Sequence, residues 1–118
     1  MIYLLMIYAN EADWTMKSEA EMAPLMQAHA QLEQDLRQAG KYRGCGGLAP
    51  TTAATTVRLG PGKPLITDGP YAETKEQLGG YYLVDAKDLD DALSFAARIP
   101  GMGNRAVEVR PVRDFRTP

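Results

Sequence analysis

The segment TDGPYAETKEQLGGYYLVDA, residues 67–86, joins a polar, turn-forming half to an apolar half. Its second half, GYYLVDA, predicts a β-strand that is apolar on both faces. A strand of this kind needs cover on both sides, which restricts the folds open to the chain. The first half is dense in acids, amides and glycines. It is therefore either a simple turn or the wall of a site.

Other segments of the sequence also predict strands. Residues 2–8 form a second unbroken apolar run, and AVEVRPV near the C-terminus alternates as a strand does. TTVRLG and PLITDG are two short strands around a glycine turn, a predicted hairpin. The glycines Gly79 and Gly80 at the start of a strand predict a bulge or the close approach of another backbone.

Two amphipathic helices are predicted between these strands. The first matches a capping box at Ser18 and Glu21 and ends before Gly40. Pro24 conflicts with that start, so either the helix begins later or its first turn is bent. Asp88 caps the second helix. The predicted apolar stripes are Met22, Leu25, Met26, His29, Leu32 and Leu36 on the first helix and Leu89, Ala92, Leu93, Ala96 and Ile99 on the second.

The order of elements is β-α-β-β(β)-α-β, which predicts one α+β domain over residues 1–118, a ferredoxin-like split β-α-β with an added hairpin. Two helices cover only one face of such a sheet. Leaving a few hundred Å² of apolar sheet in water would cost several kcal/mol, at roughly 25 cal/mol per Å². We therefore expect a homodimer in which two sheets pack face to face about a two-fold axis.

Composition and charge exclude several classes of function. The net charge of −2 and pI of about 5.3 give no electrostatic footprint for nucleic acid. The apolar N-terminal run MIYLLMIYA is too short to span a membrane, and the single cysteine, Cys45, has no partner for an internal disulfide. We expect a cytoplasmic protein. No phosphate-binding loop or metal-ligand spacing is present, so we expect no cofactor and no metal.

His29, the only histidine, lies within the apolar stripe of the first helix. One interpretation makes it a general acid or base, held by Glu33 one turn further on. The other makes it a half-buried histidine bonded to a backbone carbonyl or to Glu33. With no nucleophile nearby in the sequence, the second interpretation is favoured.

Asp68 begins the polar half of residues 67–86, which also has two interpretations. In the structural one, its carboxylate accepts the Tyr71 N–H and a short helix spans residues 71–78. In the functional one, Asp68, Glu73, Lys75 and Glu76 lie over a pocket, with a carboxylate as base and the lysine as a clamp for an anionic substrate. Spacing alone favours the structural interpretation, because runs of charge usually face solvent.

Residues 67–93, TDGPYAETKEQLGGYYLVDAKDLDDAL, resemble the signature of the YCII-related, DGPF-type proteins. The N-terminal MIYLLMIYANEADW and the closing RIPG and VEVRPV segments also resemble that family, so the similarity covers nearly the whole chain. Asp68, Gly69 and Pro70 match its DGPF, and Tyr71 stands where the motif has Phe. Glu73, Lys75, Glu76, Gly79 and Gly80 match the residues that follow.

The resemblance implies a dimeric α+β barrel in a small bacterial cytoplasmic protein, with an acid and a histidine proposed to line a cleft. It also implies an association with sigma factors of the extracytoplasmic-function type. Two hypotheses follow. The first is a small-molecule enzyme or binder with Asp68 and His29 as catalytic residues and Tyr71, Glu73, Lys75 and Glu76 as substrate-binding residues. The alternative is a regulatory or interaction module beside a sigma factor.

Overall fold

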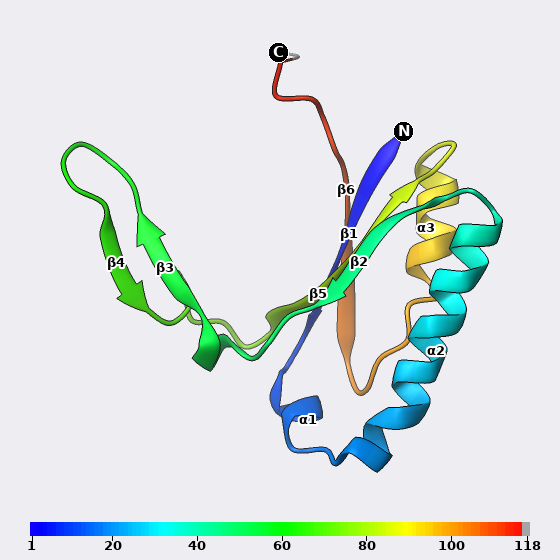
Figure 1. Ribbon diagram of the computed structural model, residues 1–118, viewed down its shortest axis with the longest axis horizontal. Helices are drawn as coiled ribbons and strands as arrows, with labels where there is room; N and C mark the ends of the chain where they lie inside the picture. Colours follow the sequence, from blue (N-terminus) through cyan, green and yellow to red (C-terminus); the bar gives the residue numbers. More distant parts are fainter. Residues whose placement is uncertain (117–118) are drawn as a thin grey trace.

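The computed structural model describes residues 1–116 and contains a four-stranded antiparallel sheet with two helices on one face (Figure 1). The strand order is β2-β5-β1-β6, with β1 Ile2–Ala9, β2 Tyr42–Gly47, β5 Gln77–Asp85 and β6 Arg105–Pro111. The helices are α2 (Glu19–Gln38) and α3 (Leu89–Ala96), and a short α1 (Ala12–Thr15) follows β1. A separate two-stranded sheet comprises β3 (Thr55–Arg58) and β4 (Leu65–Asp68), preceded by a 3₁₀ turn at Thr51–Ala53. The predicted α+β class is confirmed, and both sheets are open in the single chain.

The central strands β1 and β5 carry the core. Leu5 pairs with Tyr82 and Tyr3 with Val84 in antiparallel register, and all four side chains are buried. Leu36 of α2 packs against them from the helix side. Because side chains alternate along a strand, this set lies on one face and its neighbours in sequence lie on the other.

Helix α2 begins where its capping box predicts, despite Pro24. The Ser18 hydroxyl accepts the Glu21 N–H at 3.1 Å, and the Glu21 carboxylate accepts the Ser18 N–H at 3.1 Å. Pro24 lies inside the helix and removes one backbone hydrogen bond, which the reciprocal cap and the buried Leu32 and Leu36 offset. Within residues 1–116, no helix has the length and hydropathy needed to cross a bilayer.

The paired glycines of β5 provide both features expected of them. The register between β1 and β5 shifts at Ile7 and Tyr8, which leaves Gly79 as the extra residue of a bulge. A Cβ atom on Gly80 would lie 2.9 Å from the Gly46 carbonyl oxygen, nearer than such contacts occur. The strands β2 and β5 therefore approach each other closely only because these positions lack side chains.

Helix α3 is capped as expected, but its buried side differs from the predicted stripe. The Asp88 carboxylate accepts the Asp91 N–H at 2.9 Å. Ala92 and Ile99 are buried, whereas Leu89 and Leu93 are exposed and Phe95 packs on the core instead. The helix ends at Ala96, so Ile99 reaches the core from the following loop rather than from a continued helical stripe.

The sheet face opposite the helices, here called the uncovered sheet face, is apolar and has no helix over it. Its Met6 is nevertheless only 9% exposed, and its Leu4 and Leu83 are partly buried. Leu4 pairs with Leu83 and Met6 with Tyr81 on this face. The hairpin β3–β4 extends away from the sheet on the side opposite the helices (Figure 1). Its Leu59 and Ile66 side chains are 81% and 66% exposed.

The chain exposes more surface than a compact monomer of its mass. Its accessible surface is 8418 Å², whereas a compact 12.9 kDa monomer exposes roughly 6,300 Å². Its radius of gyration is 16.2 Å, against about 13.5 Å for a compact domain of this length. The protruding hairpin contributes to this excess of roughly 2,100 Å², since seven of its eight strand residues are exposed.

Candidate functional site

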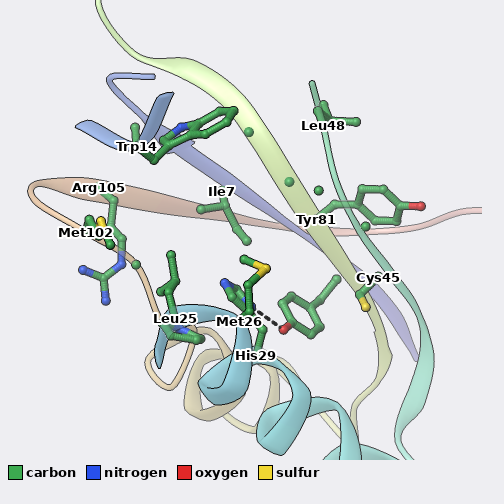
Figure 2. A pocket seen from close by; sticks show the side chains of 18 of the residues that line it. Ile7, Trp14, Leu25, Met26, His29, Cys45, Leu48, Tyr81, Met102 and Arg105 are labelled. Carbon is green, nitrogen blue, oxygen red and sulfur yellow. Dashed lines mark hydrogen bonds between the residues drawn. The ribbon is translucent and has the colours of Figure 1, made fainter. Parts of the chain in front are cut away.

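A cavity of about 470 Å³ lies between the N-terminal half of α2 and the helix-facing side of the sheet (Figure 2). Its volume falls within the range of small-molecule sites in proteins. The wall is mostly apolar and comes from β1, α1, α2, β2, β5 and the loop before β6. The larger apolar side chains that line it include Ile7, Trp14, Met22, Leu25, Met26, Leu48 and Met102.

The cavity exists because α2 packs tightly along only part of its length. Leu32 and Leu36, in its C-terminal half, are buried against the sheet. Nearer the N-terminus, the helix residues along the cavity, Ala30 among them, are not buried, and the facing strands contribute glycines, among them Gly46 and Gly79. The glycines on the strand side leave a space that larger side chains would fill.

Helix α1 closes one end of the cavity with Trp14. The backbone N–H of Glu11 donates to Gln77 Oε1 at 2.9 Å, which ties this helix to the first residue of β5. The Glu11 carboxylate accepts the backbone N–H of Thr51 at 3.0 Å and also the Thr51 hydroxyl. These bonds hold the indole beside Gly79, where an added Cβ would be 3.9 Å from the indole nitrogen.

His29 and Tyr82 form a hydrogen-bonded pair in the cavity wall (Figure 2). His29 Nδ1 lies 2.6 Å from the Tyr82 hydroxyl oxygen, and the two rings stack with centroids 5.8 Å apart. Tyr82 is 3% exposed and His29 is partly buried. The expected contact of His29 with Glu33 is wrong. Glu33 instead bonds to Arg37 and Cys45, because those partners are nearer to its carboxylate.

Burial keeps this pair neutral. It lowers the pKa of His29, and the nearby charge of Arg105 lowers it further. Burial likewise raises the pKa of Tyr82. In the tautomer in which the buried Tyr82 hydroxyl donates to Nδ1, the imidazole hydrogen sits on Nε2. The pair can therefore offer a hydrogen-bond donor or exchange a proton at that atom.

Arg105, at the start of β6, is the cation of the cavity wall. Its Nη2 donates to the Ile99 carbonyl at 3.1 Å and its Nη1 approaches the Gly103 carbonyl at 3.5 Å. A Cβ atom on Gly101 would lie 2.3 Å from Arg105 Cδ, so that glycine makes room for the side chain. No carboxylate of the described residues forms an ion pair with this guanidinium within 4.0 Å.

Cys45 belongs to a bonded cluster at another part of the wall. Its thiol donates to Glu33 Oε1 at 3.3 Å and accepts from the Tyr42 hydroxyl at 3.3 Å. Glu33 pairs with Arg37 Nε at 2.9 Å, and Arg37 stacks over the Tyr42 ring. Burial raises the pKa of the Cys45 thiol, which favours its protonated form over the nucleophilic thiolate.

Asp68 lies away from this cavity in its own chain. It is exposed at the end of β4, where it pairs with Thr55. Gly69 has a φ of 95°, which favours glycine, and its N–H donates to the Ala54 carbonyl at 2.7 Å. The expected bond from the Tyr71 N–H to Asp68 is not formed, because Gly69 already turns the chain. Asp68 and His29 do not come together within one chain.

No helix forms over residues 71–78, so that part of the structural interpretation is wrong. The Thr74 hydroxyl donates to the Glu76 carbonyl at 2.5 Å, and Gln77 Nε2 donates to the Thr74 carbonyl at 2.6 Å. These side-chain bonds and the pairing of Gln77 with Ala9 hold the segment in bends that lead into β5.

The remaining predicted site residues lie on two surfaces. Tyr71 is 77% exposed, and its carbonyl accepts from Arg58 Nη2 at 3.2 Å. Glu73 is also exposed. Lys75 and Glu76 border a separate, shallower depression of about 420 Å³, which also contains Asn10, Asp13, Gly103 and Asn104.

Sequence reasoning missed Tyr82, Trp14 and Arg105 as residues of the cavity. Tyr82 was assigned to a strand, and Trp14 to a polar connection. Alternation along GYYLVDA does place Tyr82 on the same face as Val84, toward the helices. No local pattern indicates that Arg105 reaches the same space.

Comparison with known proteins agrees with the resemblance seen in the sequence. The model of the YCII-related domain matches residues 1–116. An uncharacterised protein of Rhizobium meliloti (strain 1021) is 39% identical over 116 residues, which cover 95% of this chain and 92% of that protein. The chain therefore belongs to the family of proteins that contain the YCII-related domain.

Proposed function

We propose that this protein binds a small, largely apolar molecule in the cavity between α2 and the sheet, with His29 and Tyr82 as its proton-handling pair. The observation that carries the proposal is an apolar cavity of about 470 Å³ whose wall contains the imidazole of His29, held by a 2.6 Å hydrogen bond to Tyr82. Apolar clefts with a few convergent polar groups are the usual form of small-molecule sites. An acid–base reaction on the bound molecule would use His29 Nε2.

The protein acts as a homodimer in this proposal. The strand order β2-β5-β1-β6, with the helices on one face, supports ferredoxin-like connectivity. Two copies whose Leu4 and Leu83 faces pack together would complete a dimeric α+β barrel. Burial of the excess surface of both chains amounts to roughly 4,200 Å², within the range of obligate homodimers.

The second copy also supplies a role for the polar segment after β4. Because the hairpin projects on the side where the partner would dock, it would lie against that partner (Figure 1). We propose that Asp68, with Tyr71 and Glu73, then borders a pocket of the dimer. Asp68 would act there as the acid or base, and Lys75 and Glu76 would contact the ligand from the neighbouring depression.

Fluorescence of Trp14 tests binding in the cavity. It is the only tryptophan of the chain and lines the cavity, so energy transfer from it reports a bound naphthalene probe. N-phenyl-1-naphthylamine, a neutral probe, is expected to bind and to accept this energy. Ala30 is exposed but lines the cavity, so Ala30→Phe places a ring on the cavity wall and should abolish the signal. Ala28→Phe, the same change at an exposed position of α2 outside the lining, should preserve it. Equal signals in both variants would refute the proposed site.

A second candidate function is that of a regulatory module that binds another protein, such as a sigma factor. The exposed apolar side chains of the hairpin favour it, since exposed apolar patches mark interaction surfaces. Leu59→Ser combined with Ile66→Ser distinguishes the two in sedimentation experiments. A weakened dimer would assign the hairpin to the second copy. An unchanged dimer would leave the hairpin available to a different protein.

A further inference from the structure

We propose that the ligand of this cavity is an amphipathic organic anion, an apolar body with one acidic group that Arg105 binds. This inference rests on the cavity being a binding site, as proposed above. It concerns the charge of the ligand, which the volume and apolar lining leave open.

The first observation is the state of the Arg105 guanidinium. Its two described hydrogen bonds go to the neutral carbonyls of Ile99 and Gly103. A guanidinium has five N–H donors, so donors remain for a ligand. Arg105 is an exposed residue, so an anion can reach its free donors from solvent.

The second observation is that no other charge at the cavity cancels Arg105. Glu33 also lines the wall, but its carboxylate is paired with Arg37 at 2.9 Å and accepts the Cys45 thiol. Asp13 lies beside Gly103, outside the residues that line the cavity and beyond ion-pair distance of Arg105. Among the residues that line the cavity, Arg105 is therefore the charged group without an oppositely charged partner within 4.0 Å.

The neutral His29–Tyr82 pair adds a donor suited to the same group. In the tautomer in which the Tyr82 hydroxyl donates to Nδ1 at 2.6 Å, Nε2 carries a hydrogen and can donate. A carboxylate accepts several hydrogen bonds and matches donors of this kind. The rest of the wall, including Ile7, Leu25 and Met26, offers only apolar contact, which requires an apolar body.

Two probes that share one apolar skeleton test the charge of the ligand. Both 1-anilinonaphthalene-8-sulfonate and N-phenyl-1-naphthylamine consist of an anilino-naphthalene, and only the first carries an acidic group. Each is titrated into the full chain, with energy transfer from Trp14 as the readout. Arg105→Gln removes the cation, Arg105→Lys retains it, and Arg116→Gln removes an exposed cation that pairs with Asp114, away from the cavity.

The anionic probe is expected to bind more tightly than the neutral one. Arg105→Gln should weaken the anionic probe about tenfold or more, the size of a lost charge-assisted hydrogen bond, and change the neutral probe less than twofold. Arg105→Lys should recover part of the loss, and Arg116→Gln should change neither affinity. The neutral probe also checks that the cavity survives each substitution.

Two outcomes would overturn the inference, and they are distinguishable. If Ala30→Phe abolishes binding of the neutral probe but Arg105→Gln leaves the ratio of the two affinities unchanged, the cavity binds ligands without selecting anions. If Ala30→Phe changes neither probe, the cavity is not the binding site, and the inference fails with the proposed function.

Discussion

Replacement of Leu83 by lysine should separate the proposed dimer. Leu83 pairs with Leu4 at the centre of the uncovered sheet face. In a two-fold dimer the substitution would bury two unpaired ammonium groups, one from each copy. A buried charge without a partner costs about 3–5 kcal/mol, so the pair costs about 6–10 kcal/mol.

That cost corresponds to a loss of about 10⁴- to 10⁷-fold in dimer affinity. Sedimentation velocity over a dilution series measures it directly, and circular dichroism reports whether the separated chain stays folded. We expect wild-type protein to sediment as a dimer and Leu83→Lys as a monomer or an unfolded chain. Leu89→Lys, at an exposed position on α3, is the matched control and should remain dimeric.

A wild-type chain that sediments as a stable, folded monomer would refute the reasoning. So would a Leu83→Lys variant that stays dimeric with an unchanged melting temperature. Either result would mean that the apolar face tolerates water, and that the roughly 2,100 Å² of excess surface has another explanation.

Three further predictions concern the core, the histidine and the acid. Leu36→Ala should lower the free energy of unfolding by about 2–5 kcal/mol because Leu36 is fully buried. Leu59→Ala, at an exposed position, should change the free energy of unfolding little, and urea denaturation of both variants measures the difference. His29 is the only histidine, so NMR gives a single imidazole titration curve. Its midpoint should lie below the ordinary pKa of histidine because burial lowers the pKa of His29. The pKa of His29 is lower in the folded chain than in the unfolded chain, so the contribution of His29 to folding stability is complete above about pH 6.5 and decreases as the pH falls toward the folded-state pKa. An NMR midpoint at or above the ordinary histidine pKa would contradict the burial argument. Asp68→Asn should leave the melting temperature nearly unchanged, since the Asp68 carboxylate makes no hydrogen bond among the described residues. If Asp68 is the acid of the site, the same substitution should abolish turnover or weaken ligand binding. A large loss of melting temperature with unchanged ligand affinity would mean that the role of Asp68 is structural.

Much of the architecture was predictable because it depends on local interactions. The capping box of α2 involves residues three apart, and the strand patterns of β1 and β5 follow from alternation alone. The glycines of β5 predicted a bulge and a close approach because few other roles require paired glycines in a strand. The buried side of α3 was misjudged, since the helix ends at Ala96 and the loop then sets the position of Ile99.

The candidate site was less predictable because its parts are distant in the chain. His29 was identified as the one titratable group on an apolar stripe, but its partner Tyr82 lies 53 residues away. Glu33, the nearby candidate, is held by Arg37 on the same helix. Helical spacing alone does not say which neighbour a side chain prefers, and here a buried phenol on the facing strand provides the contact.

The sequence by itself determined the order of strands and helices, the two-faced apolar strands and the membership in a family, since each is written in local patterns of residues. Only the tertiary structure decided where the empty space lies. That space depends on α2 packing tightly at Leu36 but not at Ala30, opposite glycines from two strands. Arg105 joins it because β6 pairs with β1, which sets Arg105 opposite Ala9. Cavities form from mismatches in packing between distant segments, and no single segment encodes a mismatch.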